Sequence, residues 1–194
     1  PEDTRHQRAD GSLIEQRGIE WSLARIGFGA QSDGIFTGGG SQSNLMAMLL
    51  ARDSHCKRTR PQHSIKFQGL PPEANRWRIF SSQVSHFSIQ KSAALLGLGY
   101  DAVVPVACDS AFRMDITALN AEIARCHAEG LIPIAVVATA GTTDFGSIDP
   151  LNDIAEICRK EKIWMHADAA YGCGLLVSPQ HRQRIEGIHL ADSV

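Results

Sequence analysis

The sequence predicts an α/β protein built on a mostly parallel sheet flanked by helices. Segments typical of strands and of helices alternate along the 194 residues with short connections between them. The segment 131–138, LIPIAVVA, is continuously apolar, which is typical of a parallel strand covered on both faces. Polar or glycine-rich stretches follow several strand candidates, where ligands of parallel sheets bind. No composition change divides the chain, so we expect one domain over residues 1–194.

The first elements are helices. Apolar residues recur at helical spacing over 13–26, and Gly27 follows as a stop signal. A second helix is expected over 41–53, with Ser41 or Ser43 as its N-terminal cap.

A basic segment without periodicity, 54–75, is expected to be a loop that lies mostly on a solvated surface. It is followed by a strand over 77–82, a helix from about 86 to 96, and a short strand over 102–106.

The second half of the chain continues the alternation. Asp115 is placed to cap a helix, and Gly130 stands where a glycine ends one. After the apolar strand over 131–138, Pro150 opens another helix, and 163–170 is the next buried strand.

Composition excludes several classes of protein. The formal net charge of −2 and the pI near 6.5 do not favour nucleic acid or an anionic membrane as a partner. No apolar run is long enough to span a membrane. Five scattered cysteines without CxxC spacing predict neither a disulfide scaffold nor a metal site, so we expect a cytoplasmic protein without a bound metal.

The stretch GIFTGGGSQSN, residues 34–44, is a candidate phosphate cradle. Glycines let the backbone approach a ligand closely, and the helix that follows directs free N–H groups and a positive dipole end toward it. The Ser41 and Ser43 hydroxyls add further donors. The alternative is a tight turn before a helix, and this stretch taken alone favours neither.

Two further stretches follow buried strands. In ATAGTTDFGSIDP, residues 138–150, Thr142 and Thr143 offer hydroxyl donors where a ligand would lie, although turn and capping chemistry explains this stretch slightly better when it is taken alone. In SSQVSHFSIQKSA, residues 81–93, His86 stands between a strand and a helix, where a lone histidine is more often a cap or a core residue.

The stretch IWMHADAAYGCG carries a carboxylate at the end of an apolar strand. Trp164, His166 and Asp168 alternate, so they project from one face. A buried carboxylate needs a partner, and a cationic ring nitrogen would suit Asp168. The alternatives are that it caps a turn or pairs with an arginine. Small residues after it, Ala169 and Ala170 among them, leave room for a flat group.

Taken together and in this order, these stretches resemble the group II pyridoxal-phosphate-dependent decarboxylases, a family that includes glutamate decarboxylase. The segments GIFTGGGSQSNLMAMLLARD, SHFSIQKSA and ATAGTTDFGSIDPL, with WMHADAAYG, are most similar to the bacterial L-2,4-diaminobutyrate decarboxylase branch. The resemblance implies the large domain of a fold-type-I, aspartate aminotransferase-like enzyme with pyridoxal 5′-phosphate as cofactor.

The resemblance also assigns roles to residues. It implies that Gly40 and Ser41 bind the cofactor phosphate, and that His86 stacks on the pyridoxal ring as a catalytic residue. Thr143 would contact the cofactor or hold the histidine. Asp168 would pair with the pyridine nitrogen, and Ala170 would pack on the other ring face.

The same resemblance implies decarboxylation of an L-amino acid, most simply L-2,4-diaminobutyrate or an acidic amino acid, by a homodimer. None of the five lysines is placed as the Schiff-base lysine, and Ser193-Val194 match the start of the signature that leads to it. We therefore expect the chain to stop before that lysine and to be inactive alone. The alternatives are another fold-type-I lyase or desulfurase, and a non-catalytic homologue that acts only in cofactor binding or assembly.

Overall fold

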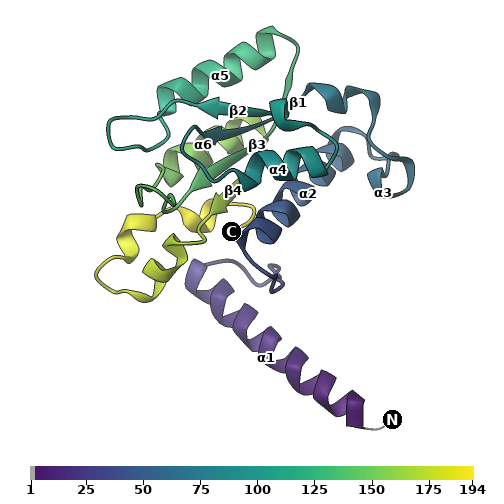
Figure 1. Ribbon diagram of the computed structural model, residues 1–194, viewed down its shortest axis with the longest axis vertical. Coiled ribbons are helices and arrows are strands. Elements are labelled where there is room, and N and C mark those ends of the chain that lie inside the picture. The colour runs from purple at the N-terminus through teal and green to yellow at the C-terminus, as the bar shows by residue number, and fades with distance from the viewer. Residues whose placement is uncertain (1–2) are drawn as a thin grey trace. The chain divides into compact units, whose positions relative to one another are not determined.

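The computed structural model describes the backbone from Asp3 to Val194 and the side chains from residue 11 onward (Figure 1). The chain divides into two compact units, one up to Gly38 and one over Gly39–Val194. No helix from Asp3 onward is long and apolar enough to cross a membrane.

The first unit is a long helix with a returning segment. Helix α1 covers Asp3–Ile26, so it begins earlier than the sequence predicted, and it ends directly before Gly27, which has a φ of 93°. The Phe36 N–H donates to Glu15 Oε1 at 3.2 Å. A Cβ at Gly18 would lie 2.8 Å from the Phe36 ring, so this glycine admits the ring against the helix.

The second unit is built on one parallel sheet, as predicted. Its strands are β1 (Trp77–Ser82), β2 (Val103–Val106), β3 (Ile132–Thr139) and β4 (Trp164–Asp168). They lie side by side in the order β2-β1-β3-β4, and all three pairings are parallel. The chain leaves β1 toward one edge and later returns to the other side of β1, so the strand order reverses between β1 and β3.

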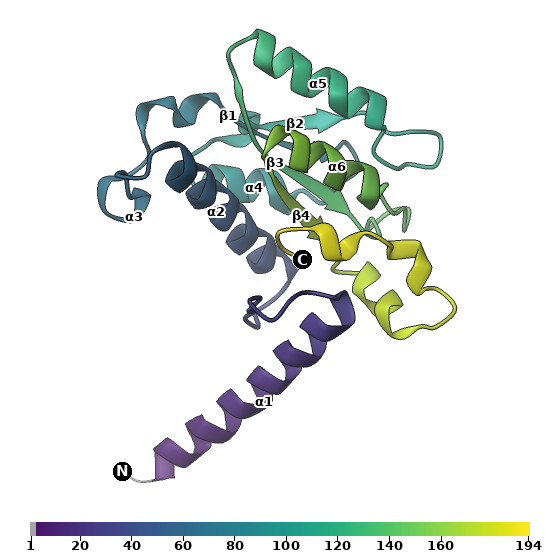
Figure 2. The same ribbon diagram turned by 180° about the vertical axis from the view of Figure 1, so that it is seen from behind.

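Helices cover both faces of this sheet (Figures 1 and 2). On one face lie α2 (Gly40–Thr59) and α4 (Ser88–Leu95), and on the other lie α5 (Ile116–Ala128) and α6 (Leu151–Glu161). The strand β3 is buried along almost its whole length, which explains its continuous apolar sequence. The apolar core under α2 and α4 includes Met48, Trp77 and Ile89.

Three sequence expectations for helices are settled by the structure. Asp115 caps α5, because its carboxylate accepts the N–H of Ala118, and Gly130 follows that helix with a φ of 70°. The predicted serine cap of α2 is wrong, because the N-cap is Gly39, without a side-chain hydrogen bond.

The predicted loop over 54–75 is only partly one. Helix α2 continues to Thr59, because His55 and Cys56 extend its buried inner face, and a short helix α3 occupies Ile65–Gln68.

A buried carboxylate fastens the connection that follows β3. Asp149 is 2% exposed, and its two oxygens accept the N–H groups of Met114 and Thr139, each at 2.7 Å. Burial raises the pKa of Asp149 to about 6, and the two backbone donors partly offset that effect. Asp149 therefore ties the 140–148 segment to the end of β3 and to the chain before α5.

Asp149→Ala is expected to lower the free energy of unfolding by about 2 kcal/mol or more, since each buried N–H left without an acceptor costs about 1–3 kcal/mol. Urea unfolding measures the change. Asp153→Ala removes an exposed carboxylate from the first turn of α6, and it should cost less than about 1 kcal/mol. Equal losses in the two variants would contradict the assignment.

The raised pKa of Asp149 also predicts that the stability of the fold depends on pH. Its folded pKa of about 6 lies above the ordinary value of 3.8, so its contribution to stability is complete below about pH 4 and is lost as the pH rises through 6. Asp149→Asn cannot ionise. The free energy by which the wild type exceeds this variant should therefore be larger at pH 4 than at pH 7 in urea titrations. A difference that grows with pH would refute this.

Candidate functional site

The candidate site lies at the carboxyl ends of β1, β3 and β4, next to the point where the strand order reverses. Open parallel sheets bind ligands at such a point, because the chains that leave the neighbouring strands diverge to opposite faces. A cavity of about 230 Å³ lies there. It is lined by Gly40, Ser41, Asn44, His86, Thr139, Gly141, Thr143, Asp168, Ala170 and Tyr171.

All six residues predicted from the sequence line this one cavity, although they come from four separate segments. Gly40 and Ser41 form the first turn of α2, and His86 lies between β1 and α4. Thr143 follows β3. Asp168 is the last residue of β4, and Ala170 follows it.

The N-terminus of α2 is suited to an anion. The helix has 20 residues, its first turn contains no acidic side chain, and Gly39 precedes it with a φ of 150°, a conformation that other residues rarely adopt. The N–H groups of Gln42 and Ser43 donate to the Gly39 carbonyl, at 2.9 and 3.1 Å, so Gly40 and Ser41 carry the backbone N–H groups that precede these bonds. The helix dipole adds positive potential at this end. This end of α2 can therefore bind a phosphate, as the sequence suggested.

Asp168 is a buried carboxylate without a cationic protein partner. It is 9% exposed, and among residues 11–194 it forms no ion pair with a lysine or arginine. Its Oδ2 accepts from the Asn44 amide at 2.9 Å, and its Oδ1 accepts the Ala170 N–H at 3.3 Å. Burying a charge is costly unless it is compensated, so the site is prepared for a cation from a ligand.

His86 is held by the start of α4. Its Nδ1 lies 2.8 Å from Ser88 Oγ and 3.3 Å from the Ser88 N–H, which donates to it. The imidazole also contacts the Phe87 ring, with 4.2 Å between centroids. The histidine is half-buried, so one part of its ring remains available to the cavity.

Thr143 lies on a loop that is fastened from both sides. Thr142 is buried, and its hydroxyl is 2.9 Å from Ser147 Oγ, which donates to the carbonyl of Phe112. The rings of Phe112 and Phe145 stack with centroids 3.8 Å apart. Of the two predicted threonine donors, Thr142 is therefore used inside the loop, and Thr143 is the one that lines the cavity.

His166 is fully enclosed beneath the site. Burial lowers its pKa to about 4, while Asp168 and a hydrogen bond with Ser193 act in the opposite direction. It is therefore neutral at physiological pH. Trp164 and His166 both contact Ser193 Oγ, at 2.9 Å each, which confirms that these alternating residues project from one face of β4.

Two glycines allow the loops after β3 and β4 to cross. A Cβ at Gly172 would lie 1.9 Å from the Ala140 carbonyl oxygen, and a Cβ at Gly141 would lie 3.2 Å from the Gly172 nitrogen. The backbones pass each other without room for a methyl group. This crossing brings Ala170 and Thr143 to the same cavity.

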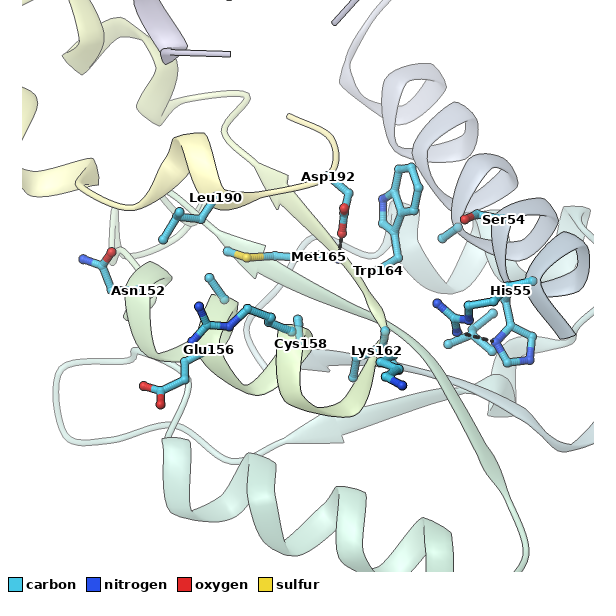
Figure 3. Close-up of a pocket in the computed structure, with 16 residues that line it drawn as sticks. Ser54, His55, Asn152, Glu156, Cys158, Lys162, Trp164, Met165, Leu190 and Asp192 are labelled. Carbon is cyan, nitrogen blue, oxygen red and sulfur yellow. Dashed lines mark hydrogen bonds between the residues drawn. The ribbon is translucent and has the colours of Figure 1, made fainter. Parts of the chain in front are cut away.

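A larger concavity of about 570 Å³ has a different character (Figure 3). It extends around the edge of β4, between Ser54 and His55 of α2 and Cys158 of α6. Burial lowers the pKa of His55 to about 4 and raises that of Cys158 to about 12, so the first is a neutral imidazole and the second a thiol. It contains none of the predicted site residues.

Four residues at or next to the cavity were not predicted from the sequence, namely Asn44, Ser88, Thr139 and Tyr171. Asn44 had a usable signal: it lies one helical turn after Gly40, on the side of α2 that carries buried Ala47 and Met48. A polar residue in such a stripe must have a buried partner. Thr139 has a buried hydroxyl without a hydrogen-bond partner in the described part of the chain.

Comparison with known proteins agrees with this geometry. Residues 17–194 match the family model of the pyridoxal-dependent decarboxylase conserved domain. The chain is 42% identical to an L-2,4-diaminobutyrate decarboxylase of Acinetobacter baumannii, over 99% of this chain and 39% of that protein. It is also 42% identical to the human cysteine sulfinic acid decarboxylase, over 94% of this chain and 35% of the relative.

A solved structure gives the same result. It is the glutamate decarboxylase domain of a diaminobutyrate-pyruvate transaminase and L-2,4-diaminobutyrate decarboxylase from Vibrio parahaemolyticus. The similarity has a TM-score of 0.92 and 45% identity, and it covers 94% of this chain and 39% of that one. The chain thus spans about two fifths of the length of these proteins.

The glycine crossing yields a matched pair of variants. Gly172→Ala must displace the Ala140 backbone, so we expect it to lower the free energy of unfolding by about 1–3 kcal/mol, as overpacking does. Gly174→Ala, two residues later, meets no atom within 4 Å and should leave stability nearly unchanged. Thermal or urea unfolding of both decides, and equal stability of the two variants would disprove the close approach.

Proposed function

Because this chain belongs to the pyridoxal-dependent decarboxylase family, we propose that it supplies much of the cofactor site of an enzyme that decarboxylates an L-amino acid. The single observation that supports this most strongly is Asp168, a buried carboxylate with no cationic partner among residues 11–194, facing a cavity. A protonated pyridine nitrogen is a ligand group that supplies the missing charge.

The residues present fit pyridoxal phosphate. The first turn of α2, with Gly40 and Ser41, would bind the phosphate through backbone N–H groups and a hydroxyl. His86 would lie against one face of the ring, and Ala170, which has only a methyl side chain, would lie against the other. Thr143 would donate a hydrogen bond at the rim. These assignments are proposals that the geometry supports.

When bound, pyridoxal phosphate supplies an electron sink for the charge left on Cα as CO₂ departs. The chain's own residues would make that sink effective. Asp168 would keep the proton on the ring nitrogen, since a buried carboxylate favours a bound cation strongly. His86 would hold the ring flat, with a proton near the reacting carbon.

The lysine that such an enzyme needs is not supplied by the described lining of the cavity, which contains no lysine. Of the five lysines, Lys91 is nearest to His86 in sequence, but it is exposed and its Nζ lies 4.2 Å from the Phe87 ring centroid. We therefore propose that another part of the full-length protein provides the lysine. This same observation favours a second candidate, a non-catalytic role in cofactor binding or assembly.

The substrate, assembly and location are proposed on the basis of the relatives. L-2,4-diaminobutyrate or an acidic amino acid is the substrate we expect, because relatives named for both kinds are about 40% identical to this chain. We further propose a homodimer in the cytoplasm, and a single cofactor-binding domain to which all 194 residues belong.

The test uses the full-length protein with pyridoxal phosphate and measures CO₂ release from diaminobutyrate, glutamate, aspartate and cysteine sulfinate. Asp168→Ala should reduce turnover about a hundredfold or more, the usual loss when a key electrostatic group is removed. Asp101→Ala, at an exposed carboxylate outside the cavity lining, should have turnover like the wild type.

Near-normal turnover of Asp168→Ala would refute its pairing with the ring nitrogen. Cofactor binding without CO₂ release from any amino acid would favour the non-catalytic role.

A further inference from the structure

We propose that Asn44 is a positioning residue whose one side-chain amide sets both Asp168 and His86 for the cofactor. This inference rests on the proposed function and adds a role for Asn44, to which the proposed function assigns none. Asn44 is 4% exposed, and its amide nitrogen donates to Asp168 Oδ2 and to Ser88 Oγ, each at 2.9 Å. The amide therefore bridges the start of α4 and the end of β4.

The orientation of this amide follows from its neighbours. An ionised carboxylate only accepts, so the amide NH₂ must face Asp168, and the amide oxygen then faces His166 Nε2 at 2.9 Å. A carbonyl-type oxygen also only accepts. His166 therefore carries its proton on Nε2, in agreement with its neutral state.

The other side of His166 closes the network. Because its Nε2 holds the proton, its Nδ1 accepts from the Ser193 hydroxyl, whose Oγ lies 2.9 Å away. The Ser193 carbonyl oxygen lies 3.2 Å from the same nitrogen and accepts the Ala167 N–H at 2.9 Å. That hydroxyl in turn accepts the Trp164 indole N–H at 2.9 Å. Each polar group thus has a defined direction, so the Asn44 amide cannot turn over without losing several hydrogen bonds at once.

The hydrogen bond from the Asn44 amide to Ser88 defines the tautomer of His86. Ser88 Oγ accepts a hydrogen bond from the Asn44 amide, so its own O–H is available to donate to His86 Nδ1 at 2.8 Å. The Ser88 backbone N–H points to the same nitrogen. His86 Nδ1 is therefore an acceptor, and the proton of the neutral ring is on Nε2.

This arrangement connects three parts of the site through one helical turn. Gly40, at the proposed phosphate end of α2, lies four residues before Asn44, so both are on the same side of the helix. The Asn44 amide then contacts Asp168 directly and is connected to His86 through the Ser88 hydroxyl. The phosphate position and the ring contacts are thereby fixed by the same rigid element.

The hydrogen bonds of the Asn44 amide with Asp168 and with Ser88 make separate predictions in the full-length protein. Asn44→Ala removes the donor from Asp168, so we expect the dissociation constant for pyridoxal phosphate, measured by tryptophan fluorescence on the apoprotein, to rise about tenfold to a hundredfold. Ser88→Ala removes only the hydroxyl that holds His86. It should lower kcat about tenfold while the cofactor dissociation constant changes less than about threefold.

Two further variants serve as controls. Ser88→Thr retains a hydroxyl and should restore most of kcat. Asn120→Ala removes an exposed asparagine whose amide donates to the Ile116 carbonyl of its own helix, and it should match the wild type in both measurements. Melting temperatures are recorded for all four variants.

A purely structural role predicts a different pattern. It would lower the melting temperature and raise the dissociation constant in Asn44→Ala and Ser88→Ala together, without rescue by Ser88→Thr, and that result would overturn the proposal. Unchanged cofactor affinity in a folded Asn44→Ala would also overturn it. If Asn44→Ala does not fold, the Ser88→Ala variant decides the outcome. An unchanged kcat in that variant would show that Ser88 does not position His86, and it would overturn the proposal. A wild-type protein that binds no cofactor would instead refute the proposed function itself.

Discussion

The site depends on a carboxylate that the fold buries without giving it a cation. Asp168 ends the edge strand β4, close to the point where the strand order reverses, and it is almost fully enclosed. Such a group is costly to bury unless charge and hydrogen bonds compensate it. The Asn44 amide and one backbone N–H supply hydrogen bonds but no charge. In the function that we propose, a bound cationic group supplies the remaining compensation from the cavity in front of Asp168.

The neighbouring features serve this arrangement. The parallel sheet brings the ends of β1, β3 and β4 to one edge, and the Gly141–Gly172 crossing lets the two following loops approach without a steric clash. Asp149 fastens the loop after β3 through two backbone donors. Burial favours the neutral form of His166, and its Nε2 lies 2.9 Å from the Asn44 amide oxygen. Rigid backbone and directed hydrogen bonds together preorganise the site.

Local patterns predicted the elements well and their ends less well. The strand over 77–82 and the Asp115 cap were predicted directly, because strand composition and capping are local properties. Helix α2 extends beyond its predicted end since the burial of Cys56 depends on a core formed by distant residues. The serine cap was wrong because Gly39 is the N-cap residue, so the helix begins at Gly40, one residue before the predicted start. Tertiary packing decided both cases.

The sequence by itself determined the α/β class, the order of the strands and helices along the chain, and six candidate site residues, because apolar periodicity, glycine turns and family motifs are local. Only the tertiary structure decided that those six residues line one cavity, that Thr143 rather than Thr142 faces it, and that Asn44 joins Asp168 to Ser88. Hydrogen bonds between residues 44 and 168 span 124 positions of sequence. Their direction depends on which donors and acceptors the folded chain brings within about 3 Å, and no local pattern contains that information.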